Sequence, residues 1–396
     1  MRNIFFLGLI SFFTDFSTEM VYPLIPLYLV SAFGATPAMI GIIEGIAESL
    51  VSLLKVYSGY LTDRFQKKKA LAFSGYAAGL VYKFALLFAG SWFGILGARL
   101  IDRVGKGIRT TPRDVLVSES ADKNNMGKAF GLHKALDMCG AAIGILVTYL
   151  IISRSVGASG GVSDGNYDYK RLFALSMIPA FLGLCMFAFV KQKKSAPLPK
   201  NREPFWKNIN KIDNQLKLYL LVVFLFTLGH ASNAFLILRA KAAGFDDRHA
   251  ILLFFVFHAT AAVFSIPFGK LSDKIGRKNL LVPGYLTFSL CYVGFAFANR
   301  PLEMTTVFIL YGVYTAMITG VERAFVAEIS PPELKGTMLG LHSTVAGIAL
   351  LPASVIAGLL WNSFGASVPF LFGAVLSFIS AILLLFFMKG RKAAGS

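Results

Sequence analysis

The chain consists of long apolar runs separated by short polar segments, and this alternation continues along almost its whole length. A helix needs about 20 predominantly apolar residues to cross the hydrocarbon core of a bilayer. The runs that reach this length are residues 4–30, 37–61, 70–90, 92–116, 128–152, 169–190, 216–239, 249–270, 279–298, 304–327, 337–361 and 367–388. The pattern therefore predicts an all-α integral membrane protein with twelve transmembrane helices.

Composition supports this fold class, and the placement of charged residues predicts which loops and termini face the cytoplasm. Of the 396 residues, 56% are hydrophobic and 15% are charged, so there is more apolar sequence than a soluble domain of this size would bury. The net charge of +18 could indicate a nucleic-acid partner, but the basic residues fall on one side of the alternating spans. The positive-inside rule then predicts an inner-membrane protein with a cytoplasmic central loop and both termini in the cytoplasm. We therefore expect the protein to be surrounded by membrane lipid and to have no nucleic-acid partner.

An internal repeat divides the chain. Residues 59–68 align with residues 269–278 at an offset of 210, and the same offset pairs Arg113 with Arg323. We therefore predict a six-helix half at residues 1–190, a cytoplasmic linker at 191–214 and a second six-helix half at 215–396. Parallel halves of this kind place a substrate site at their interface, near the bilayer midplane.

The repeated loop resembles the hallmark of the major facilitator superfamily, a G-x-L-x-D-R-x-G-R-K type sequence after the second and eighth helices. The first copy departs from it at Gln66, where glycine is usual, and the second at Lys274, where arginine is usual. The resemblance implies two pseudo-symmetric six-helix bundles, alternating-access transport and a monomer. It does not indicate a substrate.

Charged residues of the repeated loops form a predicted cytoplasmic gate. Aspartates that end two helices would face arginines near the ends of two others, and such pairs could latch one side of the protein. The residues concerned are Asp63, Arg64, Arg113, Asp273, Arg277 and Arg323. The alternative is that these loops only solubilise and orient the protein.

Ionisable residues inside the first half are the main functional signal, because charge at the bilayer centre costs at least about 2.5–3.5 kcal/mol per residue. By their distance from the span ends, Asp15, Glu48 and Arg103 lie near the midplane, and we predict that they couple proton movement to transport. Arg103 with Gly107 also resembles the family's fourth-helix motif, which is associated with proton coupling. The predicted substrate-binding residues of this half are Glu19, Glu44, Arg99, Asp102 and Lys106. The alternative is a static ion network that only holds the half together.

The second half carries fewer candidates. His230 and Asn233 are three residues apart, as on one helix face, and we predict that they contact the substrate together with His258. His258 is the repeat counterpart of Glu48. The family's fifth-helix antiporter motif is only half present, because Ile145 replaces its proline, so the direction of transport stays open.

These observations predict a secondary active transporter of a small polar or charged, anionic, organic solute, coupled to protons. The alternative within transport is a multidrug or a metal or metal-chelate (siderophore-type) transporter. A membrane-embedded enzyme or sensor is a different class, and no HExxH or P-loop pattern supports it. The three cysteines form no CxxC pair, so we predict no metal site and no cofactor.

Overall fold

A computed structural model describes residues 2–65, 67–120, 126–158, 168–192, 214–330 and 335–388, and these ranges contain helices and no strands. The first group of helices is α1 (Arg2–Val21), α2 (Leu24–Phe33), α3 (Pro37–Phe65), α4 (Lys68–Phe88), α5 (Trp92–Ser120), α6 (Met126–Ala158) and α7 (Tyr169–Cys185), followed by a 3₁₀ turn at Met186–Phe189. The second group is α8 (Asn214–Gly229), α9 (Ala234–Ala242), α10 (Asp247–Ile275), α11 (Arg277–Phe297), α12 (Pro301–Ile318), α13 (Val321–Ile329), α14 (Lys335–Phe364) and α15 (Val368–Phe387).

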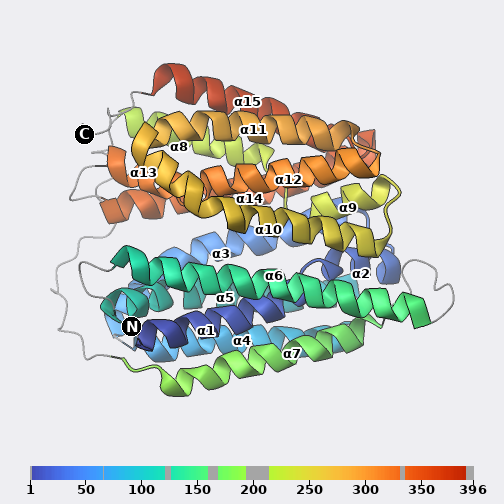
Figure 1. The fold of residues 1–396 in the computed structure, drawn as a ribbon, viewed down its shortest axis with the longest axis horizontal. Coiled ribbons are helices and arrows are strands. Elements are labelled where there is room, and N and C mark those ends of the chain that lie inside the picture. The colour runs from blue at the N-terminus through green and yellow to red at the C-terminus, as the bar shows by residue number, and fades with distance from the viewer. Residues whose placement is uncertain are drawn as a thin grey trace.

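Each predicted span corresponds to a helix or to a pair of consecutive helices. Within the described residues, 11 of them are long and apolar enough to cross a membrane. The remaining one is α5, whose charged residues keep it below the same hydropathy threshold although it lies among the other helices (Figure 1). The all-α transmembrane fold is confirmed.

Three spans that the sequence predicts as continuous helices are broken. The break between α1 and α2 falls at Tyr22–Pro23, where proline cannot donate the next helical hydrogen bond. Residues 230–233 separate α8 from α9, and Gly320 separates α12 from α13. Gly320 has a φ of 87°, which non-glycine residues rarely adopt. Hydropathy missed these breaks because the apolar content continues through them.

The two groups of helices lie side by side, α1–α7 in one half and α8–α15 in the other (Figure 1). We call the end where α1 begins and α15 ends the terminal end, on the left in Figure 1, and the opposite end the far end. The halves meet through α3 against α14 and α6 against α10. The half-helices α2 and α9 also contact each other across the halves.

Close packing inside the first half depends on two glycines of α6. A side-chain carbon on Gly140 would lie 2.1 Å from the Phe12 carbonyl oxygen, and one on Gly144 would lie 2.3 Å from that of Phe16. The backbones of α1 and α6 are therefore in direct contact, as small residues permit in membrane bundles.

We expect Gly140→Ala to lower the free energy of unfolding by about 1–3 kcal/mol, because the added methyl group forces the backbone of α1 to move. Gly97→Ala in α5 is the matched control, since nothing lies within 4 Å of the added carbon. Denaturant unfolding of both variants in mixed micelles tests this. Equal effects of the two substitutions would show that the α1–α6 contact is not tight.

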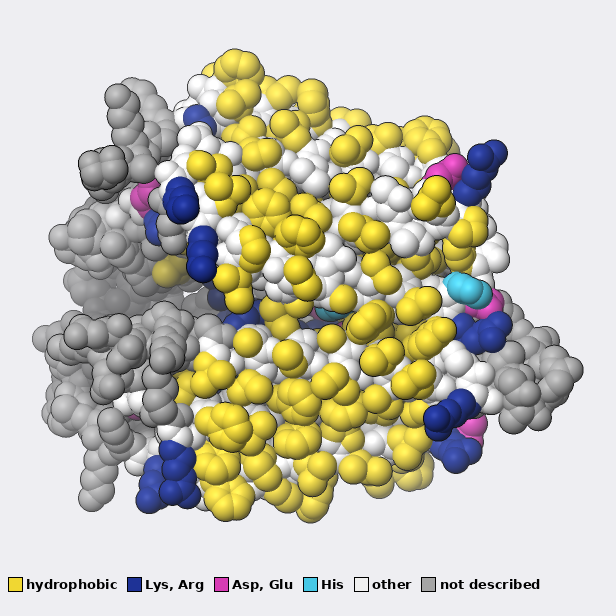
Figure 2. Space-filling view, in the orientation of Figure 1, with side chains coloured by type: hydrophobic (Ala, Val, Ile, Leu, Met, Phe, Trp, Pro, Cys, Tyr) yellow, Lys and Arg dark blue, Asp and Glu magenta, His cyan; other side chains and the backbone are white. Residues whose placement is uncertain are grey.

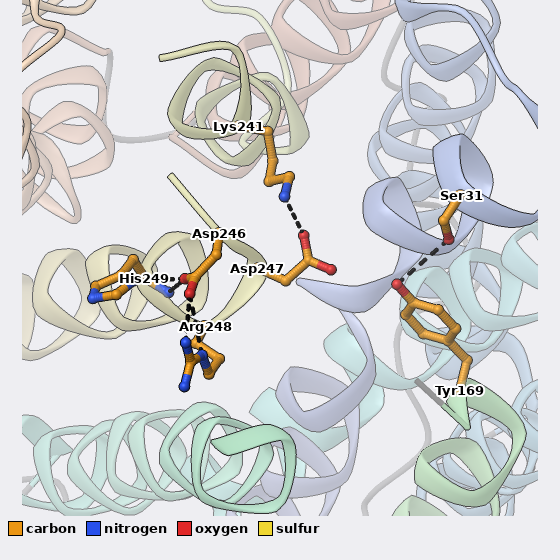
Figure 3. A network of polar contacts seen from close by, with 7 residues as sticks. All are labelled: Ser31, Tyr169, Lys241, Asp246, Asp247, Arg248 and His249. Carbon is orange, nitrogen blue, oxygen red and sulfur yellow. Dashed lines mark hydrogen bonds and ion pairs between the residues drawn. The ribbon is translucent and has the colours of Figure 1, made fainter. Parts of the chain in front are cut away.

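At the far end, polar contacts tie the short helices to their own halves (Figure 3). The Lys241 ammonium of α9 lies 2.8 Å from the Asp247 carboxylate at the start of α10. Ser31 of α2 donates a hydrogen bond of 3.4 Å to the Tyr169 hydroxyl of α7. Asp246 caps α10, because its carboxylate accepts the His249 backbone N–H at 2.8 Å.

Asp246 should make folding stability depend on pH. Partial burial acts to raise the pKa of Asp246, but hydrogen bonds from the His249 backbone and the Arg248 and His249 side chains outweigh it and lower that pKa. A lowered folded-state pKa means that the stabilisation is present at neutral pH and is lost as the pH falls below about 4.

We expect Asp246→Ala to lower the free energy of unfolding by about 1 kcal/mol at neutral pH, as loss of an N-cap does. Asp246→Asn should keep most of the cap, since asparagine also accepts the N–H, but remove the dependence on pH. Thermal unfolding at a series of acidic pH values measures both. A pH dependence in Asp246→Asn equal to that of the unsubstituted protein would contradict the assignment.

Candidate functional site

The charged side chains of α5 point into the first half rather than toward lipid. Arg99, Asp102 and Arg103 are each at most 2% exposed. They lie on successive turns of one helix, so they form a continuous stripe. The stripe faces α3 and α4, which are the helices that pack most closely on α5.

A fully buried ion pair lies at the centre of this stripe. The Arg99 guanidinium is 2.5 Å from the Glu44 carboxylate of α3, with side chains 0% and 1% exposed. The other Glu44 oxygen accepts a hydrogen bond of 3.1 Å from Ser232, which belongs to the second half. The Tyr22 ring lies 5.2 Å from the Arg99 guanidinium carbon, and its hydroxyl lies 3.4 Å from the Ser232 hydroxyl. The pair therefore joins the two halves.

A second ion pair, one turn further along both helices, is more accessible. Arg103 lies 3.2 Å from the Glu48 carboxylate, whose side chain is 30% exposed. Arg103 Nε also lies 3.6 Å from Asp102. Glu48 interacts electrostatically with His230 of the second half. The sequence placed Glu48 and Arg103 at the same depth, and the structure brings them into contact.

Asp15 has other charged neighbours than Arg103 and Glu48, although the sequence placed all three residues at one depth. Its strongest charged neighbours are Asp137 of α6, followed by Arg109 and Lys106. Asp137 is held in turn by Lys134, 2.7 Å away. Asp15 thus belongs to a carboxyl pair between α1 and α6, separate from the pair of Arg103 and Glu48.

The remaining predicted residues of the first half are Glu19 and Lys106, which interact electrostatically with each other. Glu19 interacts electrostatically with Lys106, Arg103 and Arg99. Within the described part of the chain, several buried atoms of this region have no hydrogen-bond partner. They are Glu19 Oε2, both Asp102 carboxylate oxygens, Arg99 Nε and Nη1, Arg103 Nε and Arg109 Nη1.

Sequence reasoning missed three charged residues here. Lys83 of α4 is 0% exposed, donates to the Gly79 carbonyl at 3.2 Å and interacts with Asp102. Arg109 lies 4.5 Å from the Tyr76 ring centroid. Asp137 is the third. Each is an isolated charge inside or beside an apolar span, and that signal would have found Lys83 and Asp137.

In the second half, His230 and Asn233 do not share a helix face, because both lie in the break between α8 and α9. They meet instead at Tyr311 of α12. His230 Nε2 lies 2.9 Å from the Tyr311 hydroxyl, which donates a hydrogen bond of 3.0 Å to Asn233 Oδ1. No sequence pattern marked Tyr311, since tyrosine is common in apolar spans.

His258 is surrounded by aromatic rings. Its ring centroid lies 4.7 Å from that of Phe254 and 4.4 Å from that of Phe257. It interacts electrostatically with Lys134 across the halves. Within the described residues, no group of three or more His, Cys, Asp or Glu is arranged to hold a metal ion.

The predicted gate is only partly described. Arg113 lies 2.8 Å from its neighbour Asp114 and donates to Ser11 at 3.5 Å. Arg277 lies 3.0 Å from Glu328 of α13, and Arg323 is exposed. The side chains of Asp63, Arg64 and Asp273 lie outside the described residues, so their pairing stays a prediction.

The distribution of hydrophobic and charged side chains on the surface fits a bundle that crosses a membrane. Hydrophobic side chains cover the middle of the molecule, while charged side chains gather at its two ends (Figure 2). At the terminal end an opening runs inward between the two halves, and basic side chains and an imidazole are visible in it (Figure 2). An apolar surface over two helical halves, with buried ion pairs in the first half beside the contact with the second, is typical of a membrane transporter.

Comparison with known proteins gives the family. The profile of the Major Facilitator Superfamily matches residues 7–246 and 218–396. A protein of Methanocaldococcus jannaschii described as an MFS-type transporter is 36% identical over 97% of this chain and 94% of its own length. The chain therefore belongs to the Major Facilitator Superfamily and is a transporter rather than an enzyme.

More distant matches agree on the fold. A Lactococcus lactis protein named as a multi-drug resistance efflux pump PmrA homolog is 23% identical over 84% of this chain and 81% of its own length. A crystal structure of the nucleoside transporter NupG superposes with a TM-score of 0.74 at 13% identity, covering 97% of this chain and 98% of that one.

The buried pair of Arg99 and Glu44 should behave as a unit. We expect Arg99→Met or Glu44→Gln alone to lower the free energy of unfolding by about 3–5 kcal/mol, because each leaves one charged side chain buried without its partner. The double variant should recover most of that loss, since neither charge remains.

A double-mutant cycle on denaturant unfolding measures this coupling. Arg277→Gln, which breaks a half-exposed pair, is the control and should change stability by about 1 kcal/mol or less. Additive losses in the double variant would show that Arg99 and Glu44 do not stabilise each other.

Proposed function

We propose that this protein moves a small anionic organic solute across the inner membrane by alternating access, coupled to protons. The observation that carries the proposal is the contact of Arg103 with the partly exposed Glu48, whose charge acts on His230 of the second half. A solute carboxylate can replace Glu48 as the partner of the Arg103 guanidinium, and the released Glu48 carboxylate can then bind a proton. Binding on one side would then change the charge at the surface where the halves meet.

The surrounding charges favour an anion over a cation. Arg99 and Arg103 hold the nearby carboxylates of Glu44 and Glu48, while Lys55 and Lys106 add positive charge to the same region. Unpartnered donors on Arg99 and Arg103 are sites where a solute's oxygen atoms would bind. In the second half, His230 and Asn233 around Tyr311 would contact the solute's polar groups.

We infer that Asp15 and Asp137 form a second proton-binding position, because a pair of neighbouring carboxyl groups can hold one proton between them. We further propose that the terminal end faces the cytoplasm, that residues 191–214 link two units at 1–190 and 215–396, and that the protein works as a monomer. The basic residues around that end support this orientation.

Drug export is the second candidate, favoured by the relative named as a multi-drug resistance efflux pump homolog. The aromatic cluster around Phe288, Tyr311 and Tyr314 would suit an apolar solute. The two candidates differ in the solute that binds and in whether Arg103 is needed.

We expect carboxylates to raise the thermal stability of the purified protein, and Arg103→Ala to abolish that shift, because ligands that bind the folded state stabilise it by mass action. In proteoliposomes with a pH gradient, the carboxylate that binds should accumulate. Glu48→Gln should reduce accumulation at least about tenfold, yet leave exchange of internal for external solute in place.

Glu303→Gln is the matched control, since Glu303 pairs with Arg300 at the exposed start of α12, away from the Arg103–Glu48 pair. Stabilisation by cationic drugs alone, unaffected by Arg103→Ala, would replace this proposal with drug export. Undiminished accumulation in Glu48→Gln would remove Glu48 from proton coupling.

A further inference from the structure

The break between α8 and α9 holds an imidazole whose two ring nitrogens have different surroundings. Nε2 of His230 lies 2.9 Å from the hydroxyl of Tyr311, a residue that is 1% exposed. Nδ1 of the same ring has no hydrogen-bond partner among the described residues, and the His230 side chain is partly exposed. One nitrogen is therefore fixed inside the second half, and the other is available to a solute.

The direction of the hydrogen bonds around Tyr311 determines which nitrogen of His230 carries the proton. Asn233 Oδ1 can only accept, so the single hydroxyl proton of Tyr311 is donated to it, at 3.0 Å. The Tyr311 oxygen then accepts the Nε2–H of His230. Because a neutral imidazole has one protonated and one unprotonated nitrogen, Nδ1 is left as a hydrogen-bond acceptor.

Aromatic rings hold this imidazole in place. The centroid of its ring lies 5.2 Å from that of Phe288 at an angle of 85°, and 6.4 Å from that of Tyr314 at 88°. Burying a charged imidazole among such rings is costly, and the charge of Glu48 is balanced by Arg103 at 3.2 Å. His230 therefore presents a neutral ring with a fixed orientation.

The same break touches the charged residues of the first half. Ser232, two residues after His230, donates a hydrogen bond of 3.1 Å to Glu44. Glu48 follows Glu44 by one turn of α3, about 6 Å along the helix axis, and pairs with Arg103. A solute carboxylate bound to Arg103 would thus lie beside the break that carries His230.

Neighbouring polar groups of the break already have partners. Asn233 Oδ1 accepts from Tyr311, and the Ser232 hydroxyl donates to Glu44. Nδ1 of His230 is the acceptor that these hydrogen bonds leave available. A bound solute that offers no donor would displace water from Nδ1 without replacing its hydrogen bond, and an acceptor left unpaired in this way weakens binding.

We propose that His230 selects solutes that carry a hydrogen-bond donor, a hydroxyl or an amino group, beside the carboxylate that binds Arg103. The inference rests on the proposed function in taking a carboxylate as the group bound to Arg103. The preferred solutes are then hydroxy acids or amino acids rather than unsubstituted carboxylic acids. Tyr311 is a positioning residue, because it acts on the solute through His230.

The first test determines the tautomer of His230 and requires no solute. The protein is labelled with nitrogen-15 histidine and studied in lipid bilayers by magic-angle-spinning nuclear magnetic resonance. The signals of His230 are those that disappear in His230→Gln. At about pH 8, above the usual titration range of histidine, we expect Nε2 to be protonated and Nδ1 to be unprotonated.

Asn233→Leu removes the acceptor of the Tyr311 proton, so Tyr311 can then donate to Nε2, and the share of His230 protonated at Nδ1 should rise. A protonated Nδ1 in the unsubstituted protein would overturn the inference, whatever the solute measurements show.

The second test compares solutes that share one carbon skeleton. Succinate, malate and aspartate differ in carrying hydrogen, hydroxyl or an amino group at one carbon, as do propionate, lactate and alanine. Isothermal titration calorimetry on the purified protein measures their dissociation constants. In at least one series, we expect the hydroxy or amino acid to bind at least about threefold more tightly than the parent acid, as one hydrogen bond allows.

Tyr311→Phe should reduce this preference to less than about twofold and leave the affinity for the parent acid in place, because either nitrogen of His230 can then carry the proton. Tyr219→Phe is the matched control and should keep the preference. Tyr219 lies about three turns of α8 before the break, and its ring packs on that of Phe325 at 5.0 Å. Thermal unfolding checks that both variants are folded.

The outcomes separate this inference from the proposed function. Equal affinities within both series would overturn the selection by His230 while leaving carboxylate transport in place, and so would a preference that survives Tyr311→Phe. Absence of binding by all six acids, with the tautomer as expected, would overturn the proposed function and with it the class of solute inferred here.

Discussion

The constraint on which the rest of the structure depends is that a charge inside a membrane-spanning bundle needs an opposite charge close by. The helix α5 carries so many charged residues that its hydropathy does not mark it as a span. It lies in the bundle because Glu44 and Glu48 of α3 meet Arg99 and Arg103 one turn apart. The pairing of α3 with α5 is thus a condition for inserting α5, and it also fixes where the charged site lies.

The internal repeat explains why the two halves touch at one particular point. Tyr22 and Ser232 are 210 residues apart, which is the offset of the repeat, and their hydroxyls lie 3.4 Å from each other. Residues that are related by pseudo-symmetry and also in contact lie on the symmetry axis between the halves. Both lie at helix breaks, α1 to α2 and α8 to α9, where the chain leaves regular helix. Broken helices at a midplane site are a recurrent device of transporters.

How much was predictable from sequence differs between the fold and the site. The alternation of apolar runs and polar segments predicted each spanning helix, including the charged α5, and depth along the helices put Glu48 and Arg103 at one level, because the rise per residue of a helix is fixed. The same reasoning failed for His230 and Asn233, since the helix breaks between them and Tyr311 joins them instead. It also did not identify Asp137, the neighbour of Asp15. Depth along a helix can be counted from sequence, but the angular position of one helix against another depends on packing such as that of Gly140 on Phe12.

The two halves are asymmetric in chemistry although they are related in sequence. The first half holds the ion pairs, and the positions equivalent to Glu44 and Glu48 in the second half are Phe254 and His258. A solute bound to one charged half moves nothing by itself, because a ligand shifts a conformational equilibrium only through different contacts in the two states. The Ser232 hydroxyl of the second half lies 3.4 Å from the Tyr22 hydroxyl and donates a hydrogen bond of 3.1 Å to the Glu44 carboxylate, both in the first half. These two contacts join the halves beside the ion pair of Glu44 and Arg99, so a change of charge in the first half can act on the second through them. The aromatic packing of the second half, in contrast, does not depend on charge. It supplies a surface that can move against the first half without exchanging ion-pair partners.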